Sequence, residues 1–328
     1  MSELYPLQLL PEFHERVWGT RDLSAVYHHP VTGEPVGEAW LSADSCRVAN
    51  GPLAGKTLGE LCREHGAALC GERVERKDRY PLLNKMLFPM EKLSVQVHPD
   101  DARAAAVGEP CGKTECWYVA HAEPGAAVGL GLKPGVSRES FGQAILGEGA
   151  EQLLNWIPVQ EGDLIFVGAG AVHAIGPGAV LIEAQQNSDT TYRLYDYNRG
   201  RELHIEQGLG AILEHPVAGR VAPRTIAGYE CEMHSLLVSS PNFAVERFAA
   251  REVLHFATKS VAQVLVGAAG RAEIDNGSGI AATLEAGTAV VLPATATSFT
   301  VTPVGRAEFL RVYVPACAVA EPEAIIPA

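Results

Sequence analysis

Short apolar segments separated by glycine and proline run through most of this chain, and they limit what it can fold into. Glycine (33 residues) and proline (21 residues) together make up about one residue in six of the 328. Such segments fit strands joined by turns, because glycine and proline supply turn geometries and interrupt longer elements. The predicted strands cover 93–98, 115–121, 126–132, 163–168, 179–186, 190–196, 232–238, 243–250, 261–267, 289–292 and 307–314. Strands of this length and spacing predict a mainly β fold of the sandwich or barrel type.

Four segments have helical patterns and are predicted as insertions between the strands: 56–70, 99–107, 137–154 and 203–213. In the first, Thr57 and Glu60 form a possible capping box. In the second, Pro99 occupies the predicted first helical position.

A change in composition over 215–230 indicates a linker, so we predict one domain over 1–225 and a second, almost purely β domain over 226–328. Two twelve-residue segments also match loosely: GDLIFVGAGAVH (162–173) and GTAVVLPATATS (287–298). The match predicts a duplicated β module in which Ser298 stands where the first copy has His173. Chance similarity over twelve positions is the alternative.

The charge balance and the cysteines narrow the class of protein. The net charge of −13 argues against a nucleic-acid-binding surface, which needs a basic face, but it leaves room for a small anionic substrate in a basic pocket. No run of about 18 apolar residues and no signal-like N-terminus occur, so we expect neither a membrane span nor secretion. The cysteines are scattered, odd in number and without a CxxC pair, and in a chain without a signal-like N-terminus we therefore expect reduced thiols and a cytoplasmic protein; they are Cys46, Cys62, Cys70, Cys111, Cys116, Cys231 and Cys317.

Five polar side chains lie on predicted strands where they can share one face. Gln96 and His98 alternate in VQVH, Lys113 and Glu115 alternate in KTE, and His173 stands among small residues in GAGAVHAIG. If the strands fold over one another, an amide oxygen, two imidazoles and a carboxylate converge. This set suits Zn²⁺, with Mn²⁺ or Fe²⁺ as alternatives. The other interpretation is ordinary hydrogen-bonded residues, with Glu115 paired only to Lys113.

Two aspartates directly after His98 are predicted to start a helix rather than to bind metal. Asp100 and Asp101 follow Pro99 in HPDD, and acids are favourable in a first helical turn. The preceding strand is predicted to pack its other face through apolar residues: Leu93, Val95 and Val97.

These motifs resemble type I phosphomannose isomerase in its short bacterial form. The resemblance covers about residues 6–215 and rests on QVHPDD, KTE, GDLIFVGAGAVHAIG and EAQQNSDTTYRLYDYNR, together with PEFHERVWGTRDL and GEAWLSA nearer the N-terminus. One difference lies at Gly168-Ala169-Gly170, where family members often have a proline. We expect this difference to affect the rigidity of the turn and not the chemistry.

The resemblance implies a cupin-type β-sandwich or barrel (double-stranded β-helix) with helical insertions over 1–225, followed by a second, metal-free cupin-like β module over 226–328. It implies one Zn²⁺ per chain, with these ligands: Gln96, His98, Glu115 and His173. The family's other active-site positions fall on Lys113, Glu183 and Arg193, with Asp189 close by as a substrate-binding residue.

The resemblance also implies an aldose–ketose isomerase that interconverts mannose 6-phosphate and fructose 6-phosphate by proton transfer through an enediol(ate). We expect Glu183 to move the proton, although it could instead orient another group. We expect Lys113 to reach substrate oxygens and Arg193 to stabilise developing charge. Arg199 is the predicted phosphate contact, with a solvated turn residue as the alternative.

The expected partner is a small sugar phosphate, and neither a nucleic acid nor a membrane; the chain is expected to be a monomer or a homodimer. Two other functions fit the same residues. One is a non-catalytic sugar-binding or regulatory cupin, because a fold does not fix a function. The other is an isomerase for a different sugar phosphate.

Overall fold

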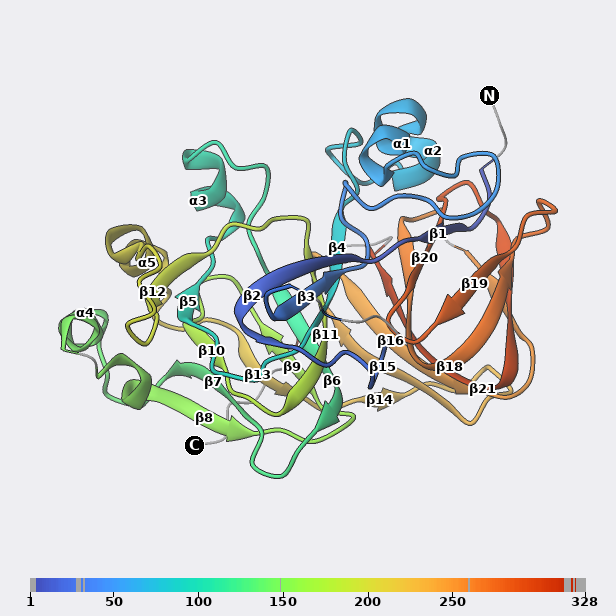
Figure 1. Cartoon of the computed structure of the whole chain (residues 1–328). Helices are drawn as coiled ribbons and strands as arrows, with labels where there is room; N and C mark the ends of the chain where they lie inside the picture. Colours follow the sequence, from blue (N-terminus) through green and yellow to red (C-terminus); the bar gives the residue numbers. More distant parts are fainter. Residues whose placement is uncertain are drawn as a thin grey trace.

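The computed structural model describes residues 4–27, 31, 33–147, 149–258, 260–315, 320 and 322, and these residues form three sheets of antiparallel strands (Figure 1). The seven-stranded sheet has the order β13 (Ala218–Val221), β9 (Leu164–Val167), β6 (Glu115–Ala122), β11 (Ala179–Gln186), β4 (Leu82–Leu87), β3 (Val36–Trp40) and β2 (Glu12–Thr20). The five-stranded sheet has the order β12 (Tyr192–Tyr195), β5 (Val95–Val97), β10 (His173–Ile175), β7 (Ala127–Leu132) and β8 (Leu154–Pro158).

The nine-stranded sheet contains most of the C-terminal part of the chain, drawn in orange and red in Figure 1. Its order is β1 (Leu7–Leu9), β20 (Ala289–Leu292), β18 (Gln263–Asp275), β21 (Ser298–Tyr313), β16 (Ala244–Ala250), β15 (Met233–Ser239) and β14 (Arg224–Thr225). In addition, β17 (Leu254–Ala257) pairs with β21, and β19 (Ala282–Glu285) pairs with β18. The mainly β prediction is therefore confirmed.

The seven-stranded and five-stranded sheets face each other around one apolar core. Trp117 on β6 points into this core, where it meets Val128 and Ile175 from the opposite sheet. Tyr118, the next residue, points the other way and packs with residues of the nine-stranded sheet, as the two-residue period of a strand requires. The metal-ligand candidates belong to the inner faces of this sandwich.

Helices cover the outer face of the five-stranded sheet. Val95 and Val97 pack there against Phe141 of α4 (Arg138–Leu146) and Ala211 of α5 (Ile205–Ala211), as predicted. Leu93 instead lies in the core between the two sheets, so its prediction was wrong. Leu93 lies two residues before β5 begins at Val95, so the strand's alternation does not fix the direction of its side chain.

All four predicted helices begin or end elsewhere than the sequence pattern indicated, and the segment 203–213 is helical only over α5 (Ile205–Ala211). The segment 56–70 divides at Gly66 into α1 (Leu58–His65), which has the predicted capping box, and α2 (Ala67–Cys70). The helix α3 (Asp101–Ala106) begins two residues after Pro99, because Asp100 is extended and caps the helix with its side chain. The segment 137–154 gives α4, a 3-10 turn η1 (Ala150–Leu153) and the first residue of β8. No helix in the described ranges is long and apolar enough to span a membrane.

The two matched twelve-residue segments have the same local structure. Gly162 and Gly287 both have positive φ (89° and 74°), and each is followed by a four-residue strand, β9 or β20. The next strand begins at His173 in the first copy and at Ser298 in the second. The predicted division at 225/226 stays a prediction, and β1 lies across it because it pairs with β20.

Candidate metal centre

Three side chains from different strands meet at the inner face of the five-stranded sheet. His98 follows β5, Glu115 begins β6 and His173 begins β10, and one ligand atom from each lies within 4.8 Å of the other two. Nε2 of His98 is 3.5 Å from Oε2 of Glu115, and Nε2 of His173 is 3.5 Å from Oε1. All three side chains are buried, with at most 1% of their surface exposed. These are three of the four predicted ligands, and the fourth is Gln96.

Backbone carbonyls orient both imidazoles toward the centre. The Nδ1 of His98 lies 3.0 Å from the carbonyl of Thr190, and the Nδ1 of His173 lies 3.0 Å from the carbonyl of Ala171. A carbonyl can only accept, so each Nδ1 carries the proton and each Nε2 presents a lone pair. The pKa of both histidines is lowered: burial is the main cause, and it lowers the pKa of His173 to about 3. Neutral imidazoles with an unprotonated Nε2 are the form that binds a metal ion.

The carboxylate of Glu115 has an oxygen that nothing in the described structure satisfies. Oε2 accepts a hydrogen bond from Nζ of Lys113 at 2.6 Å, while the buried Oε1 has no hydrogen-bond partner. Burial alone would raise the pKa of Glu115, but Lys113 and the two histidines hold it well below its usual range. A buried, ionised oxygen without a donor is costly unless a cation faces it. The donor set therefore fits a divalent metal ion.

Gln96 lies in register between two other residues of the site. Across the five-stranded sheet it pairs with Arg193 on one side and His173 on the other. Its amide nitrogen is 3.2 Å from Nε2 of His173, and its amide oxygen accepts from Ser94. A half-turn of the amide group places the oxygen where the nitrogen now lies, so Gln96 is within reach as a fourth ligand.

A cavity of about 460 Å³ opens above this cluster, between the two sheets. Its lining includes five predicted site residues, of which Lys113 and Glu183 are buried and Asp189 is exposed; the other two are Gln96 and Arg193. Lys113 donates to Nε2 of His98 at 3.0 Å as well as to Glu115. The structure thus brings together eight of the nine predicted site residues.

Among the predicted site residues, Arg199 neither belongs to the three-residue cluster nor lines this cavity. Its Nη2 donates to the carbonyl of Lys92 at 2.8 Å, and its Nε donates to the carbonyl of Asp196 at 3.2 Å. Arg201, two residues further on, lines the cavity in its place and pairs with the same aspartate through Nε and Nη2.

Glu183 is buried beside the metal cluster and has few stabilising contacts for a charge. Trp117 Nε1 donates to its Oε1 at 3.1 Å, and Nζ of Lys85 is 3.7 Å from its Oε2. Burial, followed by the nearby charge of Glu115, raises the pKa of Glu183 to about 7. A carboxyl group with such a pKa can both take up and release a proton near neutral pH.

Sequence reasoning missed a buried charge network beside Glu183. Lys85 on β4 lies within 4 Å of three carboxylates, those of Glu38, Asp189 and Glu183. Burial by itself lowers the pKa of Lys85, but these carboxylates outweigh it and the net shift is upward. Glu38 on β3 is also held by a two-point contact with Arg16. Lys85 lies in PLLNKMLF and Glu38 lies in GEAW, and both side chains point inward. An inward charge interrupts the apolar pattern by which a strand is predicted.

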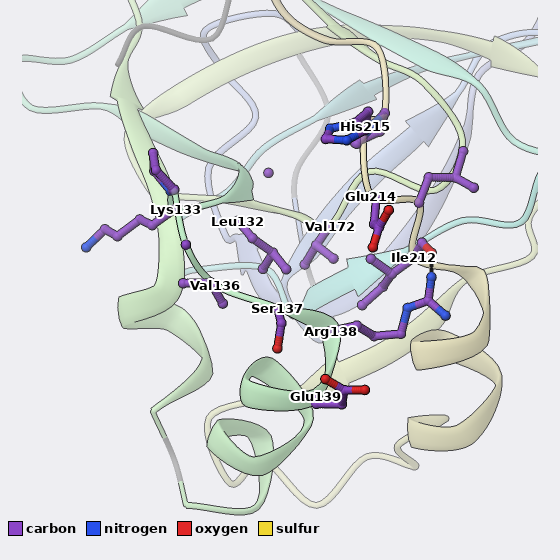
Figure 2. A pocket seen from close by; sticks show the side chains of 15 residues that line it. Leu132, Lys133, Val136, Ser137, Arg138, Glu139, Val172, Ile212, Glu214 and His215 are labelled. Atoms are coloured by element: carbon purple, nitrogen blue, oxygen red, sulfur yellow. Dashed lines mark hydrogen bonds between the residues drawn. The ribbon is translucent and has the colours of Figure 1, made fainter.

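A larger cavity lies elsewhere and holds none of the predicted site residues (Figure 2). It has a volume of about 810 Å³ and lies between the start of α4 and residues 212–216. The Nη2 of Arg138 donates to the carbonyl of Ile212 across it. Most charged side chains around it, including Lys133 and Glu139, are exposed, so it lacks the buried polar groups of the metal centre.

Comparison with known proteins places the chain in a family. The family model of the catalytic domain of type I phosphomannose isomerase matches residues 7–111. Mannose-6-phosphate isomerase of Streptococcus mutans is 39% identical over 254 residues, which is 74% of this chain and 78% of that protein.

Two solved structures superpose on nearly the whole chain. Mannose 6-phosphate isomerase from Bacillus subtilis has a TM-score of 0.84 at 31% identity, and the match covers 94% of this chain and 99% of that one. A mannose 6-phosphate isomerase bound with zinc and yttrium has a TM-score of 0.75 at 18% identity, over 94% of this chain and 99% of that one, and shares the fold. These superpositions confirm the predicted cupin-type fold class, and the identity to the Streptococcus mutans protein shows that the chain belongs to the type I phosphomannose isomerase family.

Proposed function

We propose that this chain interconverts mannose 6-phosphate and fructose 6-phosphate, with one zinc ion held by Gln96, His98, Glu115 and His173. The observation that carries the proposal is the buried Glu115 carboxylate, which has one oxygen without a donor and has Nε2 of a neutral imidazole 3.5 Å from each of its oxygens. Two imidazoles, a carboxylate and an amide oxygen form a nitrogen and oxygen donor set that suits zinc. The names of the relatives support the substrate.

The reaction must move a proton between C1 and C2 of the sugar, and the difficulty is the weak acidity of those C–H bonds. Zinc at this site would act as a Lewis acid that polarises the sugar carbonyl and stabilises negative charge beside it. The groups of the protein must then position the sugar, exclude water and carry the proton.

Glu183 carries the proton in this proposal. Trp117 occupies Oε1 as a donor, so Oε2 is the oxygen that exchanges the proton with the sugar. Because its pKa is about 7, Glu183 can both accept the proton from the sugar and return it near neutral pH. Lys85, 3.7 Å from Oε2, limits how far burial can raise that pKa and keeps the ionised form accessible.

In this proposal, arginines that line the cavity bind the phosphate group. Arg193 and Arg201 line the cavity, and the buried Nε of Arg193 has no hydrogen-bond partner in the described structure. A guanidinium group binds phosphate through a planar pair of donors. The contacts of Arg199 with backbone carbonyls favour a structural role for it, so we assign the phosphate contact to Arg193 and Arg201 instead.

A coupled assay tests this function. The purified protein is offered mannose 6-phosphate, unphosphorylated mannose and a panel of other aldose phosphates, and ketose formation is measured. We expect mannose 6-phosphate to exceed mannose in kcat/KM by about 100-fold or more, because charge-assisted hydrogen bonds to phosphate are lost with mannose. No turnover of any aldose would support a binding protein, and a preference for another aldose phosphate would change the proposed substrate.

A further inference from the structure

We infer that Asp101 and Gln186 form a clamp that positions the metal-binding segments of this site. The clamp is defined as the Asp101 carboxylate together with the Gln186 side-chain amide, and it holds the segment 112–115 beside His98. The inference rests on the proposed function in one respect, namely that His98, Glu115 and His173 bind a metal ion. Neither residue touches the metal ligands directly, so both are positioning residues.

The hydrogen bonds of the clamp converge on the backbone just before Glu115. Oδ1 of Asp101 accepts from the backbone N–H of Gly112 at 2.7 Å and from Nε2 of Gln186 at 2.9 Å. Oε1 of Gln186 then accepts from the N–H of Thr114 at 2.9 Å. The backbone N–H of Gln186 donates to the carbonyl of the same threonine at 3.1 Å. Thr114 is therefore held on both sides, between the lysine and the glutamate of the site.

This segment needs such support because β6 begins only at Glu115. Gly112 passes so close to the start of α3 that a Cβ atom there would lie 2.7 Å from backbone atoms of Asp100 and Asp101. The N–H of Lys113 donates to the carbonyl of Pro99, the residue after His98. The clamp thus joins the segment that carries His98 to the segment that carries Glu115. Loosening it would change the 3.5 Å separation between their ligand atoms.

The neighbouring aspartates have different partners, and this difference supplies a control. Asp100 caps α3 by accepting from the N–H of Arg103 at 2.8 Å and pairs with the guanidinium group of that residue. Asp101 instead directs its carboxylate away from its own helix, onto Gly112 and Gln186. Both belong to the same helix start, so a loss of helix stability alone would affect both variants.

The experiment compares zinc binding by the wild type and by Asp101→Ala, Asp101→Asn, Gln186→Ala and Asp100→Ala. Dissociation constants are measured by competition with a chromogenic chelator, and the Co²⁺-loaded proteins are compared by absorption spectroscopy. We expect Asp101→Ala and Gln186→Ala each to weaken zinc binding by about 10- to 100-fold, as loss of a ligand-supporting contact does elsewhere, and to alter the Co²⁺ spectrum. Asp101→Asn keeps the accepting oxygen, and Asp100→Ala keeps the clamp, so both should stay within about threefold of the wild type.

The double variant Asp101→Ala/Gln186→Ala sharpens the test. If the two residues act as one unit, it binds zinc no more weakly than the worse single variant. Equal zinc affinity and equal Co²⁺ spectra in the wild type and in the folded single variants would overturn the clamp while leaving the proposed metal site intact. An equal loss in Asp100→Ala would also overturn it, because helix stability would then be the cause. Failure of the wild type itself to bind zinc would contradict the proposed function, and the clamp with it.

Discussion

At the scale of single residues, the surroundings of Glu183 separate it from the other buried carboxylate. Glu115 has Lys113 at 2.6 Å and two imidazoles nearby, and its pKa is well below the usual range. Glu183 has an indole N–H and a lysine at 3.7 Å, and burial raises its pKa to about 7. These surroundings fit the proposed roles, in which Glu115 is an ionised ligand and Glu183 transfers the proton.

Glu183→Gln tests this assignment. The amide cannot take up a proton, so we expect kcat to fall by about 10²- to 10⁴-fold while the zinc content stays unchanged. In the wild type, the base must be ionised, so kcat/KM should fall as the pH drops through about 7. Near-normal exchange of the C2 proton with solvent deuterium in the variant would remove Glu183 from this role.

The histidines can be tested with a matched pair. His98 is buried in the metal cluster, whereas His121 lies exposed at the far end of β6. We expect His98→Ala to bind zinc at well below one ion per chain, because a ligand is lost from a buried site, and we expect His121→Ala to keep the wild-type content. Metal analysis of both proteins after dialysis provides the measurement, and equal zinc contents would contradict the ligand assignment.

The residues of the candidate metal site could be predicted from the sequence, but some of the charged residues around them could not. Gln96 lies on β5 and His98 directly follows it, and this alternating pattern is visible in the sequence itself. Lys85 and Glu38 were missed because their charges are satisfied by partners far away in the sequence. The different positions of Arg199 and Arg201 depend on the path of one turn, which includes positive φ at Tyr197 and Asn198, and spacing does not predict that path.

At the scale of elements, the turn between β9 and β10 is built around Gly170. This residue has φ of +84°, and a Cβ atom there would lie 2.4 Å from the side chain of Leu213. Its N–H donates to the carbonyl of His98, and its carbonyl accepts from Leu213. The turn therefore links the segments of His98 and His173. Glycine is required at position 170 because of the positive φ and because Leu213 leaves no room for a Cβ atom.

Gly170→Ala and Gly125→Ala separate backbone strain from damage to the site. Gly125 also has positive φ (+93°), but a Cβ atom there meets nothing within 4 Å. We expect Gly125→Ala to lower the free energy of unfolding by about 1–2 kcal/mol and to leave zinc binding unchanged. Gly170→Ala should cost about 1–3 kcal/mol more, because it also crowds Leu213, and should weaken zinc binding. Denaturant unfolding and zinc titration measure both effects, and identical results for the two variants would contradict the account of this turn.

At the scale of the whole molecule, the pairing register of the strands aligns more residues of the two β modules than the twelve-residue sequence match does. Glu115 pairs with Val167, and Gln263 pairs with Leu292, which is the counterpart of Val167 in the matched segments. Gln263 thus stands where the first module has Glu115, just as Ser298 stands where it has His173. These replacements remove a carboxylate and an imidazole, and they support the prediction of a metal-free second module.

The correspondence extends to the strands beside them. Lys85 pairs with Glu183 in the first module, and Glu246 pairs with Arg311 at the corresponding register in the second. Both are pairs of opposite charge, with the signs exchanged. The loose match of twelve residues predicted a duplication, and the register supports it. Sequence alone could not extend the match this far, because most corresponding residues differ and only pairing across the sheet aligns them.

The apolar core between the seven-stranded and nine-stranded sheets predicts that both modules unfold together. Leu7 of β1, Phe166 of β9 and Val264 of β18 all belong to this one buried cluster. We expect a single cooperative transition in calorimetry. Leu7→Ala should lower the midpoint of that whole transition, because removing a fully buried leucine side chain costs about 2–5 kcal/mol. Two separate transitions, with only one shifted by the substitution, would show that the modules are independent.

The most direct test of the central claim is removal and return of the metal ion. The protein is stripped with a chelator, assayed with mannose 6-phosphate, and assayed again after addition of zinc. We predict that stripping abolishes isomerisation, that about one equivalent of zinc per chain restores it in the wild type, and that zinc restores nothing in His98→Ala. Full activity in the metal-stripped wild type would contradict the account.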